Sequence, residues 1–280
     1  MKYLGAKHLI GNYIATYINN IVTPDMVDGY FEPFAGSLGV FKQMIKYNYK
    51  KYIASDLQPD IILMWKKLQN NELILPKTFD EKMWIKFKNT PSPNALKAVA
   101  GFGMSFGGQY FSGYIQKHAK GSSRDFYKEF KNSLHKIQKL IQKSNIKFYN
   151  KSYDSWEPVN MLVYCDPPYK NTVGYDTGNF DHDKFWETMR KWSKKNYVFI
   201  SEEKAPKDFK VVWQKTKRRT LNSSIRSKKI EKIYVYKYGM AYNKLANKKY
   251  TQKKYKTIYT KYKKNQTTKK SKKLKTSKNV

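Results

Sequence analysis

The segment VDGYFEPFAGSLGVFKQMI, residues 27–45, decides the class of fold. Its first part, VDGYFEPF, is a short apolar run typical of a buried strand, and Gly36 follows it in a turn. Apolar side chains then recur at helical spacing from Leu38 to Ile45. A strand, a glycine turn and a helix in this order predict an α/β sheet protein.

The same alternation continues along the chain. Apolar or β-prone runs predict further strands at 51–56, 146–149, 161–165, 197–201, 211–216 and 230–236. Helical periodicity predicts helices at 60–68, 124–143 and 183–195. We therefore predict a mixed, mostly parallel sheet covered by helices.

A long interval separates the second predicted strand from the third. It contains the amphipathic pattern of residues 124–143 and a glycine- and aromatic-rich loop, GFGMSFGGQYFSGY, at 101–114. We predict a mainly helical inserted subdomain at 75–145, between two catalytic segments, 1–74 and 146–243.

The charge points to a polyanionic partner. The chain has 56 Lys and Arg against 21 Asp and Glu, a net charge of +35, which favours nucleic acid. An AT-rich genome is the alternative explanation, because nearly all of these residues are Lys. Residues 244–280 hold 15 Lys and no acid, and without them the charge is still +20. We predict a disordered basic tail there.

Several classes of protein are disfavoured. Cys165 is the single cysteine, which excludes an intramolecular disulfide and a cysteine-rich zinc site, and the four histidines are scattered. Charges interrupt every apolar stretch, so we expect no membrane span, no signal peptide and a soluble intracellular protein. We expect no metal.

The motif YCDPPY, residues 164–169, directly follows an apolar strand, where open α/β sheets bind ligands. Methyl transfer to an aromatic amine needs hydrogen-bond acceptors that orient the nitrogen, which Asp166 and the Pro167 carbonyl supply, and a ring such as Tyr169 on which the base stacks. The alternative is a proline-stiffened turn with a buried tyrosine. Cys165 could be read as a nucleophile, but its place inside the strand favours a packed residue.

Three residues upstream suggest a cofactor site. Gly36 opens a helix, so backbone amides there can approach a ligand, although the spacing is neither GxGxxG nor GK[ST]. Asp56 ends the next strand, where a carboxylate can accept the ribose hydroxyls of an adenosine; a capping aspartate is the alternative. Lys7 could pair with the carboxylate of a methionine moiety, or be a solvated charge.

The order YxGxK, FEPFAGS, an acidic strand end, a long insert, FYNKSY and YCDPPY resembles the Dam-type, alpha-group adenine-N6 DNA methyltransferases over residues 3–236. The resemblance implies a Rossmann-like methyltransferase fold, S-adenosylmethionine as cofactor with S-adenosylhomocysteine as product, and duplex DNA with a flipped-out adenine as substrate. It assigns Asp166, Pro167 and Tyr169 to the target adenine. Matched by motif, the implied cofactor contacts are Tyr3, Lys7, Phe31, Pro33, Gly36, Asp56, Tyr153 and Asp166.

Other segments are similar to the DNA-contacting parts of the family. Tyr175 lies in GYDTGNF, which resembles the loop that closes over the target base. The candidate phosphate contacts in the last hairpin are Arg218, Arg219, Arg226 and Lys228, with a solvated charge cluster as the alternative. In the insert, Gln109 and Tyr110 are candidate base readers, although a glutamine there could equally be a turn residue.

These observations together predict a site-specific DNA adenine methyltransferase. Methylation of RNA adenine or of cytosine N4 is the alternative within enzymes. A catalytically inactive, basic nucleic-acid-binding protein with the same fold is the alternative outside them.

Overall fold

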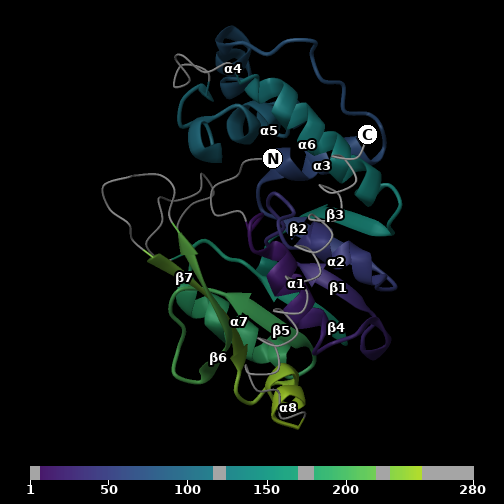
Figure 1. The fold of residues 1–280 in the computed structure, drawn as a ribbon, viewed down its shortest axis with the longest axis vertical. Helices are drawn as coiled ribbons and strands as arrows, with labels where there is room; N and C mark the ends of the chain where they lie inside the picture. Colours follow the sequence, from purple (N-terminus) through teal and green to yellow (C-terminus); the bar gives the residue numbers. More distant parts are fainter. Residues whose placement is uncertain (1–6, 116–123, 170–179, 219–227, 248–280) are drawn as a thin grey trace, which may run out of the picture.

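The computed structural model describes residues 7–115, 124–169, 180–218 and 228–247. Its centre is a seven-stranded sheet in the order β3-β2-β1-β4-β5-β7-β6 (Figure 1). The strands are β1 (Gly29–Glu32), β2 (Tyr52–Asp56), β3 (Ile146–Asn150), β4 (Met161–Cys165), β5 (Tyr197–Ser201), β6 (Phe209–Arg218) and β7 (Lys228–Tyr236). The first five are parallel, and β7 pairs antiparallel with both β5 and β6. The predicted α/β class with a mixed, mostly parallel sheet is confirmed.

Side chains alternate between the two faces of the sheet, as the pleat requires. Tyr30, Leu162 and Phe199 pack into one core, which also holds residues of α1 (Gly11–Asn19), α2 (Phe41–Met44) and α3 (Pro59–Gln69). Phe31 and Val163 pack on the opposite face against α7 (His182–Ser193). The sheet is therefore the middle of three layers, the arrangement of a Rossmann-like fold.

The predicted insert, between β2 and β3, carries three α-helices in its described part. It contains α4 (Glu81–Lys88), α5 (Ala95–Ala98) and α6 (Phe126–Ile141), which Figure 1 shows at one end of the molecule, beyond the β2–β3 edge. The apolar stripe of α6 joins the core that holds α3. Residues 101–103, predicted as loop, belong to a π-helical turn, Val99–Gly103, so the loop prediction is wrong for these three positions.

Outside the insert, two described α-helices were not predicted from the sequence. Helix α1 carries Ile14 and Ile18 on its buried face but begins without a side-chain cap, the usual sign of a helix start. Helix α8 (Met240–Asn247) packs against β5 and β7 and extends past residue 244, where the predicted tail begins. Residues 248–280 lie outside the described part. Within the described residues, no helix is long and apolar enough to span a membrane.

Candidate active site at the carboxyl ends of β1, β2 and β4

Three neighbouring parallel strands end at the same edge of the sheet. β1 ends at Glu32, β2 at Asp56, and Asp166 directly follows the last residue of β4. The strand order runs outward in opposite directions from β1 and β4. This is the topological switch point at which open α/β sheets bind ligands.

The turn after β1 is held by its own backbone. Gly36 has a φ of 43°, in the left-handed region that favours glycine. Its N–H donates to Asp56 Oδ2 (2.8 Å), and its carbonyl accepts from the indole of buried Trp65 (2.9 Å). These two hydrogen bonds tie the turn to β2 through Asp56 and to α3 through Trp65.

Asp56 joins the loops that follow β1 and β2. Besides Gly36, it accepts a hydrogen bond from the backbone N–H of Gln58 at Oδ1 (3.0 Å). Burial raises the pKa of Asp56, while these backbone hydrogen bonds act to lower it. The predicted ribose acceptor thus also caps a loop, which was the alternative interpretation; each carboxylate oxygen has a second lone pair for a ligand.

Lys7 lies inside the protein, at the start of the described chain. Its ammonium donates to Asp166 Oδ1 (2.7 Å) and lies 3.4 Å from Glu231 Oε1, with side-chain exposures of 4%, 20% and 1% for Lys7, Asp166 and Glu231. Burial acts to lower the pKa of Lys7, but the two carboxylates outweigh it and the pKa is raised. Lys7 is therefore a buried cation, which excludes the solvated-charge alternative.

Tyr169 completes this group. Its hydroxyl donates to Glu231 Oε1 (2.8 Å), and the Lys7 ammonium lies 4.8 Å from its ring centroid. Burial, followed by the charges of Asp166 and Glu231, raises the pKa of Tyr169 well above its ordinary value, so the hydroxyl keeps its proton. Three predicted residues, Lys7, Asp166 and Tyr169, thus converge. Pro167, which follows Asp166 in the sequence, is buried.

The remaining predicted cofactor residues that are described lie on the β1 side of the site. Phe31 is buried against Trp156 (5.0 Å between ring centroids), and Pro33 is buried at the end of β1. Tyr153 packs against Phe34 (5.3 Å between centroids), and burial raises its pKa to about 12. Tyr3 lies outside the described residues.

Cys165 is fully buried, with its sulfur 3.5 Å from Met189 Sδ. Burial, followed by the charges of Glu32 and Asp166, raises the pKa of its thiol well above the ordinary value. A nucleophilic cysteine needs a lowered pKa and access, so Cys165 is the packed strand residue that the sequence favoured.

Glu32 is a buried carboxyl group that the sequence prediction did not single out. It accepts a hydrogen bond from the Tyr30 hydroxyl (2.5 Å) at the end of β1. Burial raises its pKa well above the ordinary value; the Tyr30 hydrogen bond opposes this shift and the charge of Asp166 adds to it.

The raised pKa of Glu32 makes stability depend on pH. The folded protein holds a proton that the unfolded chain releases above a pKa of about 4.3. The free energy of unfolding therefore falls as pH rises from that value towards the folded pKa. We expect Glu32→Gln, which keeps an acceptor for Tyr30, to remove this decline, so that its advantage over the natural chain grows between pH 4 and pH 8. Denaturant unfolding of both proteins at several pH values measures this difference in the free energy of unfolding. If the two plots of free energy against pH ran parallel, the prediction would be wrong.

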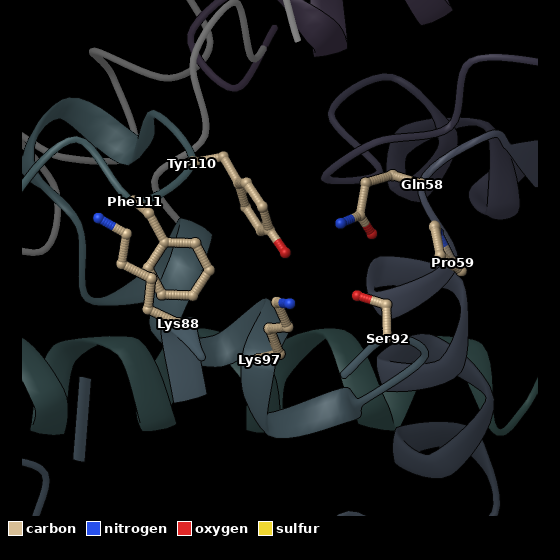
Figure 2. A pocket seen from close by; sticks show the side chains of 7 residues that line it. All are labelled: Gln58, Pro59, Lys88, Ser92, Lys97, Tyr110 and Phe111. Atoms are coloured by element: carbon tan, nitrogen blue, oxygen red, sulfur yellow. The ribbon is translucent and has the colours of Figure 1, made fainter. Parts of the chain in front are cut away.

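The insert is tied to α3 through Asp60, which has no solvent exposure. Asp60 accepts hydrogen bonds from Ser92 Oγ (2.9 Å), Asn94 N (2.6 Å), Tyr110 OH (2.8 Å) and Gln58 Nε2 (3.0 Å). A pocket of about 290 Å³ lies beside it, and Figure 2 shows Gln58 facing Tyr110 and Lys97 across it. The hydroxyl of Tyr110, a predicted base reader, is thus engaged inside the protein.

The other predicted DNA contacts are placed only in part. Gln109 is half-buried, and its carbonyl accepts from Ser112, as in a turn. Arg218 and Lys228 pair across the ends of β6 and β7 through their backbones. Tyr175, Arg219 and Arg226 lie outside the described residues.

Comparisons with known proteins agree on one family. Residues 3–92 match the model of a family described as D12 class N6 adenine-specific DNA methyltransferase. The chain is 25% identical over 248 residues to the Type II methyltransferase M.MjaIII of Methanocaldococcus jannaschii, covering 75% of this chain and 85% of that protein. It is 27% identical over 173 residues to the retron Ec67 DNA adenine methylase of Escherichia coli, covering 54% of this chain and 59% of the relative.

Among solved structures, a putative methyltransferase yhhF from Escherichia coli aligns with 80% of this chain and 84% of its own, with a TM-score of 0.33 and 10% identity. The family match spans the segment with Lys7, the Gly36 turn and Asp56, on which the resemblance in the sequence depended. The resemblance is confirmed: the chain is similar to D12-class N6-adenine-specific DNA methyltransferases.

Proposed function

We propose that the chain transfers the methyl group of S-adenosylmethionine to N6 of an adenine that has left the stack of duplex DNA. The observation that carries the proposal is the convergence of Lys7, Asp166 and Tyr169 after β4, next to the Gly36 turn and Asp56 on the adjoining strands. The acceptors for a target amine and the groups for a nucleoside cofactor then lie on either side of one switch point.

The charges around Lys7 suit this cofactor. One ammonium lies between two carboxylates, so the group carries a net charge of −1, which favours a ligand with a sulfonium. Lys7 would hold the methionine carboxylate and Asp56 the ribose hydroxyls. Phe31, Pro33, Gly36 and Tyr153 would pack around the nucleoside.

The protein groups act by orientation. Asp166 and the Pro167 carbonyl accept hydrogen bonds from the adenine amine, which turns the nitrogen lone pair out of conjugation with the ring, and Tyr169 stacks on the base. When bound, S-adenosylmethionine supplies a methyl carbon whose bond to sulfur breaks, with its electron pair staying on sulfur, as the N6 lone pair forms the new bond. N6 then loses a proton to solvent through Asp166.

DNA would lie across the insert and the basic hairpin. We propose residues 75–145 as a recognition subdomain, with Gln109 facing bases and Tyr175 covering the flipped adenine. Tyr110, predicted as a second base reader, would instead hold the subdomain against α3 through its hydrogen bond to Asp60. Arg218, Arg219, Arg226 and Lys228 would contact phosphates. The positive charge of the folded part supports a polyanionic partner.

Transfer of a labelled methyl group tests the function. We expect label from S-adenosylmethionine to appear in N6-methyladenine after digestion of unmethylated double-stranded DNA, and long-read sequencing to place it within one sequence context. Label in cytosine or in RNA would replace the proposed substrate, and no transfer from a protein that binds the cofactor would indicate an inactive relative.

The lysine-rich tail gives a test of DNA binding. Truncation should follow Asn247 and not an earlier residue, because α8 runs to that position. We expect weaker DNA binding and a salt dependence reduced by about 0.9 in logarithmic slope for each lost phosphate contact. DNA affinity measured over a range of salt concentrations checks this, and a variant with a tail of equal length and neutral sequence is the control. An unchanged slope after truncation would show that the tail does not contact DNA.

A further inference from the structure

Glu231 is a charged residue at a core position of β7. Glu231, Ile233 and Val235 alternate along the strand, and the other two are fully buried in the core that also contains α1. Only 1% of the Glu231 side chain is exposed. A carboxylate in such a place is costly unless charged and hydrogen-bonding partners compensate it.

Two of its partners are residues of the candidate active site. Glu231 Oε1 accepts the Tyr169 hydroxyl at 2.8 Å and lies 3.4 Å from the Lys7 ammonium. The same ammonium is 2.7 Å from Asp166 Oδ1. Glu231 therefore contacts the ring proposed to stack on the base and the lysine that holds the proposed acceptor.

This arrangement bears on how Asp166 is used. The proposed reaction requires Asp166 to accept from the adenine amine, yet Lys7 occupies one of its oxygens. Because Glu231 is a second carboxylate within reach, the ammonium stays neutralised when Asp166 turns to the base. Of the two carboxylates near Lys7, only that of Asp166 would remain if Glu231 were removed. The attraction between the Lys7 ammonium and the Asp166 carboxylate is strong at low dielectric.

We propose that Glu231 is a positioning residue. Its charge neutralises Lys7, so that Asp166 can leave the ion pair and bind the adenine amine, and its hydrogen bond from the Tyr169 hydroxyl fixes the position of the Tyr169 ring. The inference rests on the proposed function and adds a residue from the last strand of the sheet to it. Glu231 would act through Lys7 and Tyr169 and would not touch the substrate.

The first experiment compares Glu231→Gln with Glu187→Gln. Both changes remove one carboxylate, but Glu187 is exposed on α7. We expect Glu231→Gln to slow single-turnover methyl transfer about 10- to 100-fold, the loss that small misplacements of reacting groups cause. Cofactor and DNA affinities should change less than about threefold, because neither ligand contacts Glu231. Glu231→Asp, which keeps the charge, should recover part of the rate.

The second experiment asks whether the effect passes through Lys7. In a Lys7→Met background we expect Glu231→Gln to cost less than about threefold, since the interaction energy vanishes when one partner is absent. An equal loss in both backgrounds, or an unchanged rate in Glu231→Gln alone, would overturn the proposal. The double variant lacks both the Lys7 and the Glu231 charge, so neither of these two charges is left buried without the other. It therefore still allows the test if a single variant fails to fold.

A third readout does not depend on activity. Acetylation of lysines followed by mass spectrometry should show Lys7 labelled several-fold faster in Glu231→Gln, because the ammonium has lost a partner that raises its pKa. Lys42, which contacts His8 beside Lys7, is the internal reference. Equal acceleration of both would indicate loosening of the segment and overturn the specific role. If the natural chain transfers no methyl group, the proposed function fails while this comparison still tests the contact.

Discussion

Asp166→Ala is expected to lower the rate of methyl transfer by roughly 100- to 1,000-fold, the loss that follows removal of one preorganised hydrogen-bonding group from a reaction site. Asp166 directly follows β4, and its carboxylate is held by Lys7 at 2.7 Å. Removing it takes away the acceptor that orients the adenine amine. Cofactor binding should persist, because Asp56 and the Gly36 turn are unaltered.

Single-turnover transfer of labelled methyl groups measures the rate, and titration calorimetry with S-adenosylmethionine measures the affinity for the cofactor. Asp166→Asn is the matched variant, since it keeps the shape and one acceptor oxygen but removes the charge. We expect its rate to lie between those of the natural chain and Asp166→Ala. Unimpaired turnover in the alanine variant would remove Asp166 from the mechanism.

Asp56→Ala is expected to weaken S-adenosylmethionine binding by about tenfold or more, since hydrogen bonds to a charged group contribute roughly 1.5–3 kcal/mol each. The variant also leaves the N–H groups of Gly36 and Gln58 without their carboxylate acceptor. The free energy of unfolding should therefore fall together with the affinity.

The two effects of Asp56 can be separated. Asp56→Asn retains an oxygen that can accept from one backbone N–H, so its melting temperature should fall less than that of the alanine variant. Calorimetric affinity for S-adenosylmethionine, measured well below the melting temperature, then reports the ligand contact itself. Equal affinity in the natural chain and Asp56→Ala would refute the ribose assignment and leave Asp56 with the capping role alone.

The catalytic strands could be predicted because their patterns are local. The runs at 161–165 and 197–201 coincide with β4 and β5, since buried parallel strands are short, apolar and bounded by polar residues. The first strand was predicted at 27–34 but is limited to Gly29–Glu32. Its neighbour Pro33 cannot donate a hydrogen bond to a ladder.

Glu231 could not be recognised in the same way. In the sequence KKIEKIYVY both sets of alternate residues of β7 mix charged and apolar side chains, so the pattern does not say which set faces inward. Only the fold brings Lys7 and Tyr169 to it, from more than 60 positions away in the chain. The Asp60 cluster was missed for a similar reason, because an aspartate in a first helical turn looks like an ordinary favourable charge.

The bonding of Asp60 has a mechanical consequence. Three of its donors, Ser92, Asn94 and Tyr110, come from the insert, and the carboxylate belongs to a helix that packs on the sheet. Rigid-body rotation of the insert about this point would strand a buried charge, which costs several kcal/mol. The insert and the sheet should therefore move as one body when DNA binds, and fluorescent labels on α4 and α7 should keep their separation when DNA is added.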